Sequence, residues 1–167
     1  MNKSLNFIFI FFLLLFLQVF VLNNILFLGY INPYVYIAFV FLYPLKENRF
    51  PLLFYSFLLG VGVDFFSDTG GIHTFSTVFI AYVRLFFIKL YFKKVTIDYP
   101  FFSLQSEPFG KVFNYVVTLT IVHHFIYFSF VNFSFQNYSN VFLNTIYSSI
   151  FTLVLYFLGT YIFVKKQ

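Results

Sequence analysis

Hydrophobic residues occur in six long runs that are separated by short polar breaks. The runs cover positions 4–28, 33–45, 51–66, 72–92, 109–131 and 139–163. Apolar and polar positions do not alternate within them, which argues against the strands of a closed β-barrel. Because lipid cannot satisfy backbone hydrogen bonds, apolar runs of this kind are expected to be helices. The pattern predicts an all-α fold, a polytopic integral membrane helical bundle of about six transmembrane helices.

Positive charge is distributed unevenly among the breaks. All of the Lys and Arg residues except Arg84 lie near alternate breaks. They are Lys3, Lys46, Arg49, Lys89, Lys93, Lys94, Lys111, Lys165 and Lys166. The breaks around 23–32, 67–73 and 132–140 contain no Lys or Arg. Since basic residues stay on the cytoplasmic side, this distribution predicts six crossings with both termini in the cytoplasm.

The composition agrees with a membrane protein. Of 167 residues, 61% are hydrophobic and only 9% are charged, and a soluble domain of this length cannot bury so much apolar surface. Nearly every stretch belongs to a predicted span, so residues 1–167 are interpreted as one transmembrane domain. The net charge of +5 is juxtamembrane and indicates contact with anionic membrane lipids rather than nucleic acid. The absence of Cys excludes disulfides and thiol chemistry.

The second and third runs are short. As helices, 33–45 spans about 20 Å and 51–66 about 24 Å, against a hydrocarbon core of about 30 Å. The second run either continues upstream through 26–31 or is re-entrant. Re-entrance of both runs gives an alternative topology with four spans and the same charge distribution.

Several tyrosines lie near predicted span ends. A ring with a polar tip suits the lipid headgroup boundary, so these residues are expected in interfacial belts. They are Tyr30, Tyr34, Tyr43, Tyr91, Tyr138 and Tyr161.

Two acidic residues and several glycines mark the outer end of the third run. Asp64 lies within the run and Asp68 follows four positions later, so both carboxylates share one face if the helix continues that far. Gly60 and Gly62 would let another helix approach closely at this point, and Gly71 belongs to the turn that follows.

Arg84 lies within the fourth run, about 13 Å from its cytoplasmic end, while Asp64 is about 20 Å from that side on the third run. Ionisable groups within spans are costly and need partners. We therefore expect an Asp64–Arg84 pair that locks the third and fourth helices together. The alternatives are that Arg84 extends to the cytoplasmic interface, or that these residues bind a ligand directly.

Three histidines fall in or next to spans. His73 begins the fourth run, and His123 and His124 lie in the fifth. Adjacent helical residues face about 100° apart, so His123 and His124 are not both expected to point inward. No HxxxH or HExxH spacing occurs and no catalytic motif is present. We predict interhelical hydrogen bonding, with no metal, cofactor or catalytic residue.

The order of these features resembles the MreD family, the rod shape-determining membrane proteins of bacteria. The matching residues are Leu17-Gln18-Val19, Asn32-Pro33, Gly60-x-x-x-Asp64, Gly71 and Ala81-Tyr82. The run from Gly60 to His73 and the pair His123-His124 resemble the Bacteroidota version. The similarity extends over nearly the whole chain.

The resemblance implies a non-enzymatic scaffold in the bacterial cytoplasmic (inner) membrane. Such a protein regulates cell shape and lateral peptidoglycan synthesis by binding MreC, and through it the MreB filament and the RodA–transpeptidase synthase. Asp64, Asp68, Arg84, His123, Gly60 and Gly71 are then candidate structural or partner-binding residues.

Two other hypotheses remain open at this point. The family is similar in fold to the substrate-binding subunits of vitamin transporters, which implies a small-molecule or lipid-binding subunit with an outer cavity lined by Asp64, His73 and His123. An integral membrane enzyme, such as a lipid-linked hydrolase, requires polar groups that converge on a water-accessible pocket.

Overall fold

The computed structural model describes residues 3–25, 31–45, 48–92, 104–132 and 138–163. These residues form an all-α bundle, as predicted. Its helices are α1 (Lys3–Phe16), α2 (Ala38–Leu42), α3 (Phe50–Ser67), α4 (Ile72–Phe92), α5 (Phe109–Val131) and α6 (Tyr138–Phe163). A π-helical stretch (Leu17–Val21) and 3₁₀ turns (Leu22–Asn24, Val35–Ile37 and Leu104–Ser106) complete the described elements.

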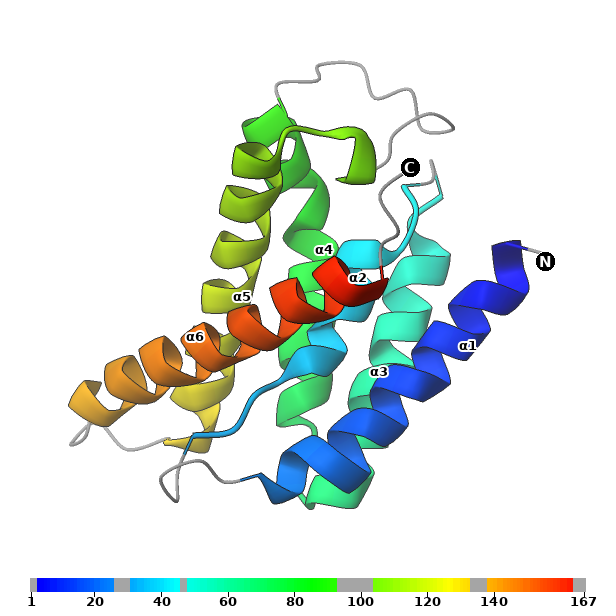
Figure 1. Ribbon diagram of the computed structural model, residues 1–167. Helices are drawn as coiled ribbons and strands as arrows, with labels where there is room; N and C mark the ends of the chain where they lie inside the picture. Colours follow the sequence, from blue (N-terminus) through cyan, green and yellow to red (C-terminus); the bar gives the residue numbers. More distant parts are fainter. Residues whose placement is uncertain (1–2, 26–30, 46–47, 93–103, 133–137, 164–167) are drawn as a thin grey trace.

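Within the ranges that the structure describes, five helical segments are long and apolar enough to cross a membrane. They are Asn6–Asn24, Phe50–Ser67, Ile72–Phe92, Phe109–Val131 and Tyr138–Ile162. The third hydrophobic run therefore forms an uninterrupted helix of 18 residues, which disfavours the four-span alternative. α1 starts and α6 ends toward the end of the bundle where α4 ends and α5 begins, and the α3–α4 turn lies at the opposite end (Figure 1).

The second hydrophobic run is not a regular membrane-spanning helix. Residues 31–45 pass from the end that holds the α3–α4 turn to the opposite end as an irregular stretch, a 3₁₀ turn and the short helix α2 (Figure 1). Extended and 3₁₀ backbone rises farther per residue than an α-helix, so a short segment reaches across. The proposed upstream continuation, 26–30, lies outside the described residues.

This irregular segment forms the centre of the core. Tyr36, Ile37, Val40 and Phe41 are at most 1% exposed, because α1, α3, α4 and α6 pack around them. Backbone without regular helical hydrogen bonds is tolerated at membrane depth only when protein surrounds it. The position of the second run is thus decided by its neighbours and not by its own length.

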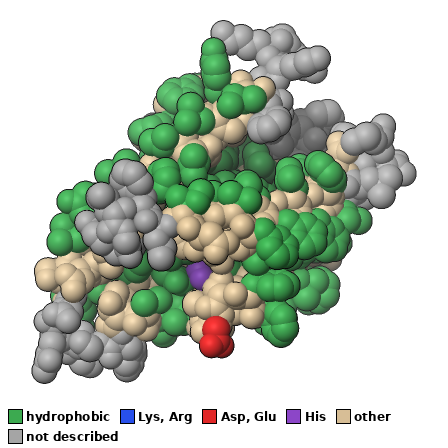
Figure 2. Space-filling view, turned by 60° about the horizontal axis from the view of Figure 1, so that its bottom comes forward, with side chains coloured by type: hydrophobic (Ala, Val, Ile, Leu, Met, Phe, Trp, Pro, Cys, Tyr) green, Lys and Arg blue, Asp and Glu red, His purple; other side chains and the backbone are tan. Residues whose placement is uncertain are grey.

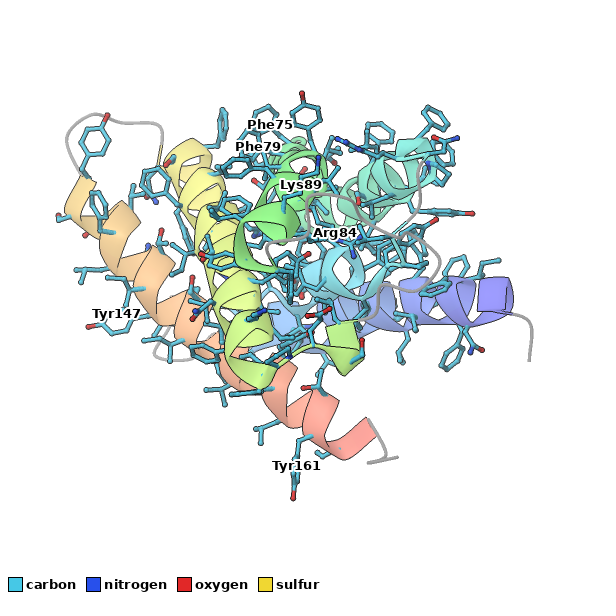
Figure 3. All side chains as sticks on the ribbon, turned by 90° about the horizontal axis from the view of Figure 1, so that it is seen from above. Phe75, Phe79, Arg84, Lys89, Tyr147 and Tyr161 are labelled. Atoms are coloured by element: carbon cyan, nitrogen blue, oxygen red, sulfur yellow. The ribbon has the colours of Figure 1, made fainter. Side chains whose placement is uncertain are left out.

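The outer surface is rich in aromatic side chains. Phe75, Phe79, Tyr147 and Tyr161 all point away from the bundle (Figure 3). Such a surface is suited to lipid, as the composition indicates.

The tyrosine belt is only partly present. Tyr138 and Tyr161 are 53% and 79% exposed, as expected for interfacial residues. Tyr34 and Tyr43 are only 5% and 6% exposed. The prediction was wrong for these two because they belong to the irregular segment that the other helices enclose. Tyr30 lies outside the described residues.

Candidate functional site

Asp64 joins α3 to the start of α4. Its carboxylate accepts hydrogen bonds from the backbone N–H groups of His73 (3.0 Å) and Thr74 (2.8 Å) and from the hydroxyls of Thr69 and Thr74. The first N–H groups of a helix have no partner within it, and a negative charge near them is favourable. Asp64 therefore acts as a capping group for α4, supplied by the neighbouring helix.

Gly60 allows the close approach that this cap requires. A Cβ atom at Gly60 would lie 2.9 Å from the backbone N of Thr74 and would also collide with its Cα. A Cβ at Gly62 would meet the side chain of Leu15 on α1, with Cδ1 at 2.9 Å. The prediction that these glycines permit close helix packing is confirmed, and the helices they admit belong to this chain.

The turn after α3 separates the two acidic residues. Asp68 has a left-handed backbone (φ 53°) and ends α3, and Gly70 and Gly71 also have positive φ values of 61° and 98°. α3 ends at Ser67, so the condition under which Asp64 and Asp68 would share one helix face is not met. Asp64 is buried, whereas Asp68 is exposed. On the face seen in Figure 2 an acidic side chain stands out among hydrophobic ones, and no Lys or Arg is visible among the described residues.

Arg84 does not pair with Asp64. Its Nε donates to the hydroxyl of Tyr115 (3.0 Å), and its Nη2 donates to the carbonyl groups of Phe41 (3.2 Å) and Tyr43. Arg84 lies 11 residues beyond His73, about 17 Å along α4, so the expected ion pair is too long to form. Arg84 instead satisfies carbonyl groups at the C-terminal end of α2, where a positive charge is favourable.

A tyrosine hydroxyl links two histidines in the core. The hydroxyl of Tyr36 lies 2.9 Å from Nδ1 of His73, 2.9 Å from Nε2 of His123 and 3.2 Å from Oγ1 of Thr77. All four side chains are at most 1% exposed. The predicted interhelical hydrogen bonding of His73 and His123 is confirmed, and the partner that connects them comes from the irregular segment.

His124 holds the same segment from the other side. Its Nε2 lies 3.0 Å from Oγ1 of Thr152 on α6, and that oxygen also accepts the backbone N–H of Tyr34 at 2.9 Å. His123 and His124 are both fully buried, so the expectation that they do not both point inward was wrong. α5 packs against α4 on one side and α6 on the other, so two neighbouring faces of this helix are interior.

Gln18 completes the polar core from α1's side. Its amide donates to the carbonyl of Pro33 (3.0 Å), and its Oε1 accepts the backbone N–H of Tyr36 (3.3 Å). Backbone groups of the irregular segment thus form hydrogen bonds with the side chains of Gln18, Thr152 and Arg84. Sequence reasoning missed Tyr36 and Thr152 and assigned Tyr34 to the interface, because a chain with 14 Tyr and many Ser and Thr offers no signal that separates these from the rest.

The polar core is filled by protein side chains. The ring of Tyr34 lies 5.2 Å from that of His73 and 5.3 Å from that of His124, and the rings of His73 and Tyr127 stack at 4.5 Å. Asp64, His73 and His123 are therefore held in contact with other residues of the bundle. Within the described part of the chain, no group of three or more His, Cys, Asp or Glu residues is placed to hold a metal ion.

Removing the hydroxyl of Tyr36 is expected to lower stability. In Tyr36→Phe the two buried histidines lose their common partner, and leaving buried polar groups unsatisfied costs about 1–3 kcal/mol. Thermal unfolding of the purified protein in detergent should show a lower midpoint. Tyr161→Phe, at a position that is 79% exposed, serves as the control and should leave the midpoint unchanged. Equal midpoints for both variants would contradict the role of Tyr36.

These features define a class of protein. The chain is a multi-pass α-helical membrane protein, and its described residues include five membrane-length helices around a buried, irregular segment. Comparisons with models of known protein families, with curated proteins and with solved structures found no match.

Proposed function

We propose that this chain is a non-enzymatic scaffold of the bacterial cytoplasmic membrane, of the MreD type, that takes part in cell elongation by binding MreC. Through MreC it would act with the MreB filament and the RodA–transpeptidase synthase in lateral peptidoglycan synthesis. The observation that supports the proposal is structural, because residues on which the resemblance rests connect neighbouring elements of the bundle. Gln18, Gly60 and Asp64 hold neighbouring elements of the bundle together.

The exterior near the α3–α4 turn supplies a suitable contact region. Phe65 and Phe66 at the end of α3 are 80% and 53% exposed, and Asp68 is exposed in the turn beside them. A partner with one membrane span and an outer segment can pack against the aromatic side chains and reach the polar turn together. Asp64, Gln18 and Tyr36, by contrast, are buried and hydrogen-bonded to other elements of the bundle.

Site-specific cross-linking tests this proposal. A photoreactive residue placed at Phe65 should form an adduct with MreC in cells that express both proteins. The matched control is Phe109, which is 70% exposed at the opposite end of the bundle and should give much less adduct. The proposal fails if MreC neither cross-links at Phe65 nor co-purifies with the unmodified chain.

The alternative is a small-molecule or lipid-binding subunit like those of vitamin transporters. The irregular second crossing favours it, because discontinuous spans form substrate sites in many transporters. The rings of Tyr34 and Tyr36 occupy the space where such a ligand would lie, so the scaffold is the better-supported proposal. Native mass spectrometry of the purified protein would reveal a retained small molecule if the alternative holds.

A further inference from the structure

The three buried histidines differ in how their neighbours fix the position of the imidazole hydrogen. A neutral imidazole donates from one ring nitrogen and accepts at the other. Nδ1 of His124 lies 2.8 Å from the carbonyl oxygen of Thr120, which can only accept, so Nδ1 carries the hydrogen. Nε2 of His124 then accepts from the hydroxyl of Thr152. Both nitrogens of His124 have partners, and its tautomer is fixed.

His73 and His123 share one hydroxyl group, so their tautomers are linked. Nδ1 of His73 and Nε2 of His123 each lie 2.9 Å from the hydroxyl oxygen of Tyr36. These two hydrogen bonds need two hydrogens, and the hydroxyl supplies only one. One histidine must therefore donate to Tyr36 while the other accepts from it. Thr77 is a further donor to this oxygen, at 3.2 Å, and does not compete for its hydrogen.

The second nitrogen of His123 decides between the two arrangements. Among the described residues, Nδ1 of His123 is buried and has no hydrogen-bond partner. Buried donors without an acceptor are rarer in proteins than under-used acceptors, so we expect the hydrogen of His123 on Nε2. His123 then donates to Tyr36, and Tyr36 donates to Nδ1 of His73. The hydrogen of His73 itself lies on its Nε2.

His73 is the histidine best placed to take up a proton. It lies in the first turn of α4, next to the exposed turn that contains Asp68. It is 1% exposed, whereas His123 and His124 are 0% exposed, and a histidine side chain is visible at this end of the bundle (Figure 2). The carboxylate of Asp64 accepts the backbone N–H of His73 at 3.0 Å. A positive charge on His73 would therefore have an attractive counter-charge nearby.

The titratable groups that surround His73 come from three elements. They are Asp64 of α3, Tyr34 and Tyr36 of the irregular segment, and His123, His124 and Tyr127 of α5. Tyrosine is uncharged near neutral pH. Among these neighbours, Asp64 thus supplies the charge that acts on His73.

We propose that the bundle senses acid at the α3–α4 end, because a proton taken up by His73 changes the tautomer of His123 through Tyr36. With hydrogens on both nitrogens, His73 can only donate to Tyr36. The hydroxyl of Tyr36 then donates to Nε2 of His123, whose own hydrogen moves to Nδ1 by exchange with water during local opening. One proton is added, and the three groups carry four hydrogens instead of three.

The change of tautomer alters the core away from the protonated residue. In the acid state the Nδ1–H group of His123 is a buried donor without an acceptor among the described residues, which weakens the hold of α5 on the irregular segment. The switch lies in the interior of the bundle and does not depend on the partner that the proposed scaffold function places outside. Either proposal can fail without the other.

Nuclear magnetic resonance of the full-length chain in detergent micelles, with ¹⁵N-labelled histidine, tests the switch. The chain has three His residues, and the protonated and bare nitrogens of a neutral imidazole give well-separated ¹⁵N signals. As the pH is lowered from about 8, His73 should gain a second N–H. His123 should lose its Nε2–H signal and gain an Nδ1–H signal with the same midpoint. His124 should keep its tautomer.

Three variants show whether Tyr36 carries the change. Tyr36→Phe removes the shared hydroxyl, so His123 should keep one tautomer throughout the titration. His73→Gln removes the proton acceptor and should have the same effect on His123, which keeps the test decisive if Tyr36→Phe does not fold. Tyr127→Phe is the matched control, because it removes a hydroxyl from a ring that stacks on His73 but does not link the two histidines. It should preserve the switch.

Three results would overturn the proposal. In the first, His73 stays neutral down to the pH at which the protein unfolds. In the second, His73 is protonated and His123 keeps its tautomer. In the third, the tautomer of His123 still changes with pH in Tyr36→Phe or in His73→Gln.

Discussion

Replacing Gly60 by alanine is expected to destabilise the protein by about 3 kcal/mol, at the upper end of the usual cost of overpacking. The added methyl group would collide with the backbone of Thr74, which cannot move aside as the end of a flexible side chain can. α3 and α4 would separate, and the carboxylate of Asp64 would lose its short contacts with the N-terminal turn of α4.

The matched control for this change is Gly159→Ala in α6. A Cβ atom there has no neighbour within 4 Å, so the substitution should be neutral or slightly stabilising, because alanine favours helix by about 1 kcal/mol over glycine. Chemical unfolding in mixed micelles, followed by circular dichroism, measures both variants. A Gly60→Ala protein as stable as Gly159→Ala would contradict the close α3–α4 contact.

The second large effect is expected from Asp64→Ala. This change leaves two backbone N–H groups of α4 and the hydroxyls of Thr69 and Thr74 without their acceptor. Loss of a capping residue costs about 0.5–2 kcal/mol, and loss of hydrogen bonds to a charged group costs more, so a total of about 3 kcal/mol is expected.

Asp68→Ala is the appropriate comparison, since it removes the same charge from an exposed position four residues away. It should lower the free energy of unfolding by only about 1 kcal/mol, because the exposed charge contributes little and alanine tolerates the left-handed backbone at this position less well than aspartate. Asp64→Asn keeps one acceptor oxygen and should fall between the two alanine variants. If Asp64→Ala and Asp68→Ala unfold alike, the cap does not stabilise the bundle.

The membrane-spanning helices were predictable, and the second crossing was not. The runs that became α3, α4, α5 and α6 are long and continuous, so their own composition decides their structure. The run 33–45 is short, and its backbone is stabilised by Gln18, Thr152 and Arg84, which lie on three other elements. No local pattern reveals such partners, because they are distant in sequence.

The polar core was likewise predicted only in part. Asp64, Arg84 and His123 stood out in the sequence because ionisable residues within spans are costly and need a reason. The partners of Asp64 and Arg84 were predicted incorrectly, because their opposite charges suggested that they pair with each other. In the structure Asp64 binds the N-terminal end of α4 and Arg84 binds the C-terminal end of α2. Tyr36 links two histidines.

The sequence by itself determined where the long apolar segments of the chain lie and that they form helices. This follows from the free energy of moving each residue between water and lipid, which depends on local composition. Only the tertiary structure decided what each buried polar side chain binds. A hydrogen bond forms with whichever group packing brings within about 3 Å, and that distance depends on how all the helices fit together.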